Sequence, residues 1–175
     1  MRLPVLGGRV AQIDQLLAPH HSIGWDFDGT LMGHPNSPLM HDYIRRFPEK
    51  RHWIVTFRAH GLEEEVFSLL RGDYYTHAPR RADFAGVLNI SAWAHYRRSR
   101  VMTKRERGWD GFETRAERNW NTWKGRACRK AGITVMIDDD VFAVQEGCET
   151  YGIAFIHPMA FNEPMVARRW PVLVL

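Results

Sequence analysis

The sequence predicts an α/β fold with a parallel sheet of about five strands and helices on both faces. Short apolar runs alternate with amphipathic or charged segments along the 175 residues, which is typical of strands joined by crossover helices. Two of these runs end in carboxylates, at Asp26 and Asp138, and parallel strands bring their carboxyl ends to one edge of a sheet. The length and the 45% of hydrophobic residues fit a single domain over 1–175, so a second full domain is not expected.

Apolar periodicity and chain breakers predict the elements in order. Apolar residues recur at helical spacing over 9–18 and Pro19 follows, so a helix is expected there. Apolar runs predict buried strands at 22–27 and 51–57. The other expected elements are a turn at 34–38, helices at 39–47 and 62–70, a weak strand at 87–90, a helix from about 114 to 130, a strand at 133–137, a helix around 141–149 and a strand at 153–156.

The stretch 97–112 has no clear period, is charged and contains glycine, so we expect a basic loop or small insertion. Its cationic side chains are Arg97, Arg98, Arg100, Lys104, Arg105 and Arg107. They suit the phosphates of a nucleotide or polynucleotide, and the neighbouring Trp93, Tyr96 and Trp109 suit base stacking. A solvated charged loop with aromatic packing anchors is the alternative.

The overall composition favours anionic partners and an intracellular setting. The net charge is +4 and the isoelectric point is near 9.3, with arginine supplying most of the excess. No apolar run approaches the roughly 20 residues that cross a bilayer, and the first residues lack the apolar core of a signal peptide. We therefore expect a cytoplasmic protein without a membrane partner, and we expect Cys128 and Cys148 to be free thiols.

The first acidic motif lies in segment 25–31, which reads Trp-Asp-Phe-Asp-Gly-Thr-Leu. In an extended chain Asp26 and Asp28 would point the same way, while Phe27 enters the core. Two neighbouring carboxylates are costly unless a cation lies between them, and their hard oxygen atoms suit Mg²⁺. An acidic turn after a core strand is the alternative.

The second acidic motif is the run Asp138, Asp139 and Asp140, which follows the apolar strand at 133–137. A metal site can be assembled from both motifs, because both strands end at the same edge of a parallel sheet. Three successive aspartates leave the register of the metal ligands open by one position. Asp140 is expected to act as a helix N-cap rather than as a ligand.

Together these motifs resemble the haloacid dehalogenase superfamily of phosphohydrolases. Its first motif reads Asp-x-Asp-Gly-Thr, its second places a Ser or Thr after an apolar run, as Thr56 follows Ile54-Val55, and its fourth is an apolar run before Asp-Asp. The resemblance implies an open α/β sheet of the Rossmann-like kind and Mg²⁺-dependent hydrolysis of phosphate monoesters through an aspartyl-phosphate. It implies that Asp26 is the nucleophile, that Asp28 is the general acid/base and that Thr56 contacts the phosphate. It further implies that the metal is bound by Asp26, Asp28, Asp138 and, through water, Asp139. Gly29 and Thr30 would bind the substrate. A β-branched strand residue is the alternative for Thr56. Arg58 is a candidate to grip the substrate, unless it is a solvated surface group.

The superfamily's third motif is a single lysine, and geometry favours Lys124. The helix at 114–130 precedes the strand at 133–137 and should run antiparallel to it, so its N-terminal part lies nearer the acidic edge. Lys124 also borders an apolar stripe that includes Trp120. Lys104 is the alternative if the basic stretch folds over the site, whereas the two remaining lysines, Lys50 and Lys130, are poorly placed.

The short interval between Thr30 and Thr56 leaves little room for a large cap, so a minimal cap and an open site are expected. The expected substrate is a phosphorylated small molecule or nucleotide, with nucleic acid as a further candidate. A catalytically silent protein of this fold that binds nucleic acid is the alternative function. The sequence does not predict an oligomeric state.

Overall fold

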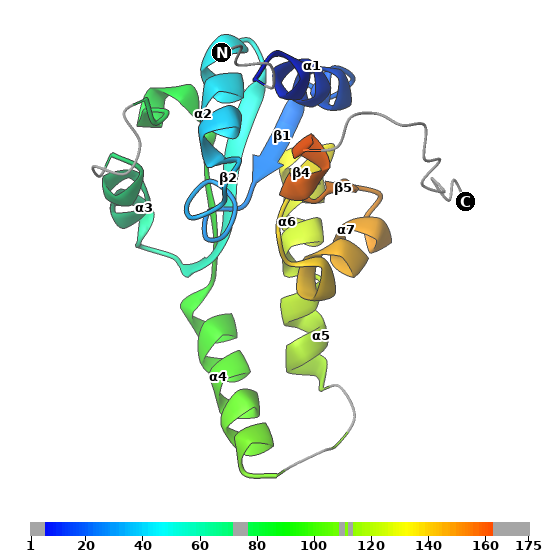
Figure 1. Cartoon of the computed structure of the whole chain (residues 1–175). Helices are drawn as coiled ribbons and strands as arrows, with labels where there is room; N and C mark the ends of the chain where they lie inside the picture. The colour runs from blue at the N-terminus through cyan, green and yellow to red at the C-terminus, as the bar shows by residue number, and fades with distance from the viewer. Residues whose placement is uncertain (1–5, 72–76, 109–110, 112–113, 163–175) are drawn as a thin grey trace.

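Five parallel strands form the centre of the structure, in the order β3-β2-β1-β4-β5 (Figure 1). The computed structural model describes residues 6–71, 77–108, 111 and 114–162. The strands are β1 (Ser22–Trp25), β2 (Arg51–Ala59), β3 (Gly86–Ile90), β4 (Val135–Ile137) and β5 (Ala154–Ile156). All neighbouring pairs are parallel, which confirms the predicted α/β fold with a five-stranded sheet.

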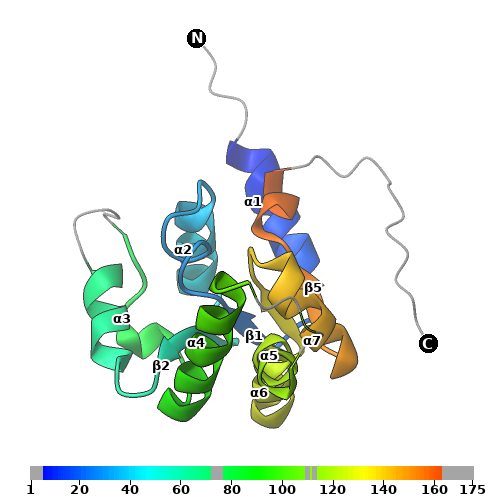
Figure 2. The same ribbon diagram turned by 90° about the horizontal axis from the view of Figure 1, so that it is seen from below.

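Helices cover both faces of the sheet, as predicted (Figure 2). The helices on the faces are α1 (Leu6–Leu17), α2 (Ser37–Arg46), α3 (Glu63–Leu70), α6 (Trp123–Ala131) and α7 (Glu146–Thr150), and the chain also forms α4 (Ala92–Glu106) and α5 (Arg115–Asn121). Shorter turns are η1 (Arg81–Asp83), the π-helical η2 (Val141–Gln145) and η3 (Pro158–Asn162). No helix among the described residues is long and apolar enough to cross a membrane.

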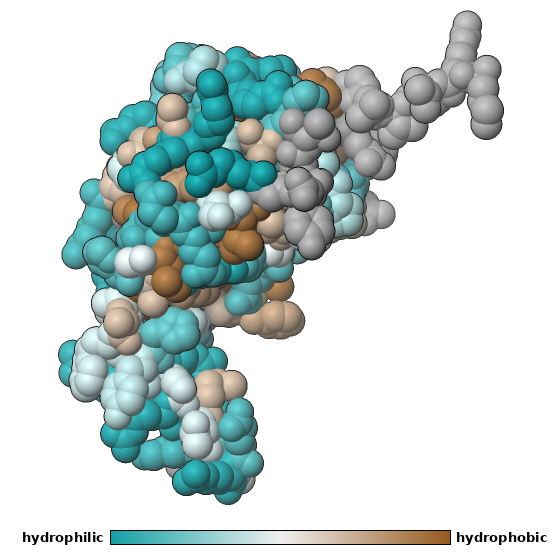
Figure 3. Space-filling view, turned by 90° about the vertical axis from the view of Figure 1, so that its left-hand side faces the viewer, coloured by the Kyte–Doolittle hydropathy of each residue, from teal (hydrophilic) through white to brown (hydrophobic). Residues whose placement is uncertain are grey.

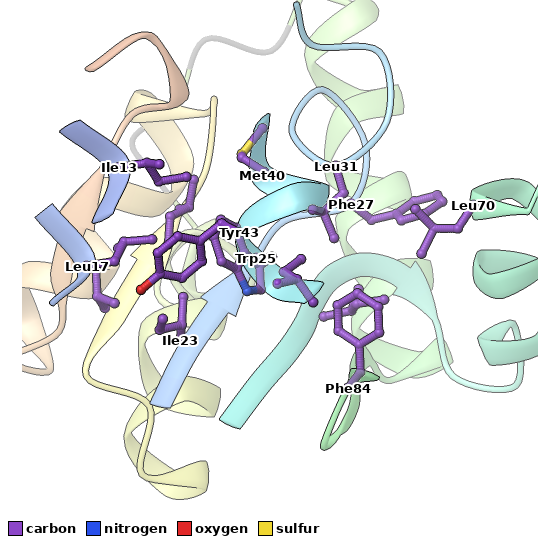
Figure 4. Packing of buried hydrophobic residues seen from close by; sticks show 14 of the residues in the cluster. Ile13, Leu17, Ile23, Trp25, Phe27, Leu31, Met40, Tyr43, Leu70 and Phe84 are labelled. Atoms are coloured by element: carbon purple, nitrogen blue, oxygen red, sulfur yellow. The ribbon is translucent and has the colours of Figure 1, made fainter. Parts of the chain in front are cut away.

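Alternating strand residues divide the core into two clusters, one on each face of the sheet. Ile54 packs with the cluster under α1, α2 and α3, whereas the next residue, Val55, packs with the cluster under α6 and α7. Figure 4 shows the first cluster, where Trp25 and Tyr43 lie between sheet and helices. The second cluster contains Cys128 and Cys148, which are buried free thiols, as expected.

The structure corrects the expected basic loop at 97–112. Residues 97–106 belong to α4, whose N-cap Ser91 accepts a hydrogen bond from the amide of Ala94. The helical period escaped the sequence prediction because no residue of α4 is buried, so its apolar residues form no stripe. Residues 109–110 and 112–113 lie outside the described part of the chain, and they include Trp109, which was predicted to suit base stacking.

Helices α4 and α5 project together beyond the sheet, and we call them the α4–α5 arm (Figure 1). Arg105 of α4 donates to both carboxylate oxygens of Glu117 at 2.5 and 3.0 Å. These bonds lower the pKa of Glu117 to about 2. Glu117 also closes a capping box with Thr114 at the start of α5, so one carboxylate joins the two helices and caps the second.

The helix expected at 114–130 is divided into α5 and α6 at Thr122. Helix α6 then packs very closely on α7. A Cβ added at Gly125 would lie 2.0 Å from the carbonyl oxygen of Gly147, so only glycine permits this approach. The contact fixes α6 beside the ends of β1 and β4.

Candidate active site

Asp26 and Asp138 lie side by side at the carboxyl edge of the sheet. Strands β1 and β4 pair in a register that places Trp25 opposite Ile137, and the amide of Asp26 donates to the carbonyl of Ile137 at 2.8 Å. Each aspartate therefore directly follows its strand. Asp26 is 5% exposed and Asp138 is fully buried, so both carboxylates are removed from bulk water.

Lys124 contacts both of these carboxylates. Its Nζ lies 2.5 Å from Oδ1 of Asp26 and 2.7 Å from Oδ2 of Asp138, and its side chain is almost fully buried. The Nζ also lies 4.6 Å from the centre of the Phe57 ring. The structure thus brings the predicted lysine to the two acidic strand ends, from the second residue of α6.

One ammonium faces two buried carboxylates, and their pKa values reflect this imbalance. Burial raises the pKa of Asp26, Lys124 lowers it and Asp138 raises it again, so that the net change is upward. The pKa of Asp138 is raised by burial as well, against the effect of Lys124. Burial lowers the pKa of Lys124, but both aspartates reverse this, and the lysine stays protonated.

Asp139 completes a group of three carboxylates. Asp26, Asp138 and Asp139 each offer an oxygen, and these oxygens all lie within 4.8 Å of one another. Thr30 donates from its hydroxyl to Oδ1 of Asp139 at 3.3 Å. Gly29 has a φ of +79°, and a Cβ there would lie 2.4 Å from Oδ2 of Asp139, so this turn requires glycine.

The third residue of the acidic run has a structural task. Asp140 is the N-cap of η2, and its carboxylate accepts from the amides of Phe142 and Ala143. This confirms the cap predicted for Asp140. Its own amide donates to Oδ1 of Asp138 at 2.9 Å and holds that carboxylate in place.

Asp28 does not share the orientation of Asp26, contrary to the alternation expected of an extended chain. Strand β1 ends at Trp25, and the chain then turns, with the amide of Leu31 donating to the carbonyl of Asp26 at 3.2 Å. Asp26 is therefore buried, whereas the side chain of Asp28 is 58% exposed. Among the described residues, the three-carboxylate group does not include Asp28, one of the predicted metal ligands.

Arg58 holds Asp28 through two parallel hydrogen bonds. Its Nε donates to Oδ2 at 2.9 Å and its Nη2 to Oδ1 at 2.8 Å, while Nη1 reaches Glu65 of α3 at 2.5 Å. Two carboxylates thus occupy the fork that was predicted to grip a substrate. Thr56 is buried near the end of β2, and its hydroxyl accepts from the amide of Arg58 at 3.2 Å.

Two of the other lysines considered for the third motif, Lys104 and Lys50, lie away from the acidic group. Lys104 is exposed on α4 in the arm. Lys50 donates to the carbonyls of Leu17, the last residue of α1, and of His20 at 2.7 and 2.9 Å. Lys50 therefore satisfies carbonyls near a helix end, which explains its position before β2.

Two contacts near the site were not predicted from the sequence. Phe57, Trp120 and Lys124 form a continuous contact, in which the Phe57 and Trp120 rings stack 4.4 Å apart at 7°. His34 and His157 meet edge to face with ring centres 6.5 Å apart, and burial and His157 lower the pKa of His34, against the charge of Asp139. The histidines have no sequence spacing that predicts this meeting, because they come from distant turns.

The arrangement offers three oxygen ligands, a fixed cation and an exposed acid at one sheet edge. It could hold a divalent cation at Asp26, Asp138 and Asp139, next to a phosphate group stabilised by Lys124. Comparison with protein-family models, with curated proteins and with solved structures finds no match to this chain.

Proposed function

We propose that this chain is a Mg²⁺-dependent phosphohydrolase of the haloacid dehalogenase type, acting on phosphate monoesters through an aspartyl-phosphate on Asp26. One observation carries the proposal: the oxygens of Asp26, Asp138 and Asp139 lie within 4.8 Å of one another and Lys124 bridges the two buried ones. The motif order along the chain supports it. A parallel sheet also places ligands at this carboxyl edge.

The residues fit a magnesium ion by charge and by ligand type. Two buried carboxylates share one ammonium, and Asp139 adds a third negative group, so a divalent cation would offset the excess. All three ligands are hard oxygens, which Mg²⁺ prefers. Bound there, Mg²⁺ would polarise the phosphate oxygens and neutralise charge that develops on them.

Different residues of the chain carry out the separate steps of the proposed reaction. A carboxylate oxygen of Asp26 attacks phosphorus while the bond to the leaving oxygen breaks, and Lys124 stabilises the charge on the transferring group. Asp28 gives its proton to the leaving oxygen. Water next attacks the phosphorus of the aspartyl-phosphate, Asp28 takes its proton, and free phosphate and Asp26 are restored.

Arg58 holds Asp28 in its exposed position before substrate binds. The guanidinium holds both oxygens of Asp28, and a substrate phosphate competes for the same donors. Entry of the phosphate would release Asp28, which then takes up a proton from water and can act as general acid, while Arg58 remains with the substrate. This exchange reconciles the predicted roles of Asp28 and Arg58 with their contact.

Asp26→Asn tests the proposed function. The variant keeps the shape of the side chain and can still accept from Lys124, but it lacks a nucleophilic carboxylate. We expect the wild-type chain to release phosphate from p-nitrophenyl phosphate with Mg²⁺, and Asp26→Asn to fall to background. The experiment would also seek the aspartyl-phosphate by mass spectrometry after rapid acid quenching.

Asp140→Asn is the matched control, because it removes a carboxylate from the same edge but keeps an N-cap acceptor. It should retain activity. Phosphate release by Asp26→Asn at the wild-type rate would exclude Asp26 as the nucleophile. A folded wild-type chain that hydrolyses no phosphate monoester would favour the silent, binding-only alternative.

A further inference from the structure

One face of α4 carries two aromatic rings followed by three cations. At 3.6 residues per turn these side chains recur on one side of the helix, over a rise of about 16 Å. They form what we call the α4 stripe: Trp93, Tyr96, Arg97, Arg100 and Lys104. No carboxylate belongs to the stripe.

The opposite face of α4 is occupied by α5. His95 meets the ring of Trp120 edge to face at 5.4 Å, and both Arg98 and Arg105 reach Glu117. The side of α4 that carries Trp93, Tyr96, Arg97 and Arg100 therefore faces away from α5, while Lys104 lines a cavity with Thr114 at the start of α5. Figure 3 shows the arm as a distinct lobe below the rest of the molecule, with a mainly hydrophilic to neutral surface on this side.

The two rings of the stripe are unusually accessible for aromatic side chains. Trp93 is 66% exposed and Tyr96 is 52% exposed. Their centres lie 5.6 Å apart in a stacked arrangement tilted by 28°, and the guanidinium of Arg100 lies 5.9 Å from the Tyr96 ring. Exposed flat rings beside cations present stacking surfaces and phosphate contacts together.

We propose that the α4 stripe binds single-stranded nucleic acid. Bases would stack on Trp93 and Tyr96, and the phosphates would contact Arg97, Arg100 and Lys104. At about 3.4 Å per phosphate, the stripe matches about five nucleotides of a stacked strand. The rings require open base faces, which a duplex does not present, so the preferred form is single-stranded.

The stripe begins at the sheet edge that carries the acidic group. Strand β3 ends at Ile90, the cap Ser91 follows, and Trp93 is the second residue of α4. A nucleic-acid strand that lies along α4 would have one of its ends at this edge of the sheet. Resting on the proposed phosphohydrolase function, this placement makes the phosphorylated end of single-stranded nucleic acid the substrate class.

Binding is measured first, without any chemistry. Fluorescence anisotropy would follow a fluorescein-labelled, unphosphorylated oligothymidylate of fifteen nucleotides, with the full-length chain and no Mg²⁺. We expect Trp93→Ala with Tyr96→Ala to weaken binding at least about fivefold per ring, and Trp93→Phe with Tyr96→Phe to restore most of it. Arg97→Gln with Arg100→Gln should reduce the salt slope by about 0.7 for each lost contact.

Arg129→Gln with Lys130→Gln is the matched charge control. It removes the same charge from the last turn of α6, at the opposite edge of the sheet, and should leave binding within about twofold. Equal losses in this control and in the stripe variant would overturn the proposal, as would tight binding that is indifferent to the rings. Stronger binding to polyglutamate than to the oligonucleotide would instead assign the stripe to an acidic protein.

Hydrolysis is measured second, so that the two proposals fail separately. We expect the ring variants to lose kcat/KM on a 3′- or 5′-phosphorylated oligonucleotide while their kcat/KM on p-nitrophenyl phosphate stays unchanged. Equal effects on both substrates would contradict a role of the stripe in substrate choice. Oligonucleotide binding without any phosphate release would refute the proposed function and leave the binding surface standing.

Discussion

At the residue scale, the site depends on one buried lysine between two buried carboxylates. Removing such charges from water costs several kcal/mol for each ion, and an ion pair regains this only with close contacts. Lys124 makes such contacts at 2.5 and 2.7 Å, yet it is one ammonium facing two carboxylates, and burial raises the pKa of both aspartates against its effect. The imbalance is an expensive arrangement for stability alone, and we interpret it as preparation for a cation.

Added Mg²⁺ should therefore stabilise the folded chain. At ten times its Kd, a ligand specific for the folded state contributes about 1.4 kcal/mol, which corresponds to about 3 to 5 °C in Tm for a domain of this size. Asp138→Asn keeps the side-chain shape but removes a ligand charge, and should abolish the gain. Thermal melting with and without Mg²⁺ measures both.

Asp140→Asn serves as the control for the metal, because Asp140 caps η2 and should retain the Mg²⁺ response. The reverse pattern, in which Asp140→Asn loses the response and Asp138→Asn keeps it, would move the metal ligand to Asp140.

Lys124→Met should cost both activity and stability. Loss of one electrostatic contact to the transferring phosphoryl group typically lowers the rate by about 10² to 10³. The two buried carboxylates would also lose their counter-charge, at a cost of about 3 to 5 kcal/mol near neutral pH. Because the stranded carboxylates can take up protons, we expect this stability loss to shrink as the pH falls toward 4.

Lys104→Met is the comparison for Lys124→Met, since Lys104 is exposed on the arm. It should leave the Tm and the hydrolysis of p-nitrophenyl phosphate nearly unchanged. Kinetics on folded protein and melting curves at pH 5 and pH 8 distinguish the two lysines, and a larger rate loss in Lys104→Met would assign the phosphate contact to the arm.

The sequence predicted some of these side-chain positions and missed others for a physical reason. Asp26 and Asp138 follow apolar strands, and antiparallel helix geometry directed Lys124 to them, so regular structure carried the prediction. Asp28 lies beyond the end of β1, where alternation no longer applies, and its pairing with Arg58 depends on a turn. Contacts formed by turns follow no sequence periodicity, so periodicity cannot predict them.

At the element scale, the site depends on how closely α6 approaches α7. Gly125 and Gly147 allow backbone contact, and Lys124 immediately precedes the first of them. The same glycines had no signal in the sequence analysis, because only the packed structure shows which surface they face. The position of α4 was missed for a related reason, since a helix without buried residues lacks an apolar stripe.

Gly125→Ala should separate α6 from α7. The added methyl group would lie 2.0 Å from the carbonyl oxygen of Gly147, and backbone must move to accept it. We expect a loss of about 3 kcal/mol in the free energy of unfolding, although alanine favours a helix over glycine by about 1 kcal/mol. Denaturant unfolding measures the loss, and Arg129→Ala, exposed on the same helix, should stay within about 0.5 kcal/mol of wild type.

A Gly125→Ala variant as stable as wild type would mean that the two helices can separate without penalty. In that case the contact would not position Lys124, and p-nitrophenyl phosphate hydrolysis in the variant should be unaffected as well.

At the scale of the whole molecule, a closely packed sheet carries an arm that is held mainly at its base. The sheet has a core on each face, whereas α4 has no buried residue and depends on contacts with α5 and β2. The Phe57 and Trp120 stack belongs to this base and continues to Lys124. The arm and the acidic site are therefore in physical contact, although they differ in packing.

Hydrogen exchange should reveal this difference, with amides of α4 opening at lower free energy than those of β1 and β4. Trp120→Ala removes the stack on Phe57 and the contact with His95, and we expect it to speed exchange in α4 about tenfold, equivalent to about 1.4 kcal/mol, with little change in the central strands. Trp93→Ala is the control, because Trp93 lies on the same arm but faces away from α5. Equal acceleration in the two variants would contradict the role given to Trp120, and acceleration of β1 and β4 together with α4 would show that the arm and the sheet unfold as one unit. Faster exchange of α4 in Trp120→Ala alone, with slow exchange kept in the sheet, would establish that Trp120 holds the arm at its base.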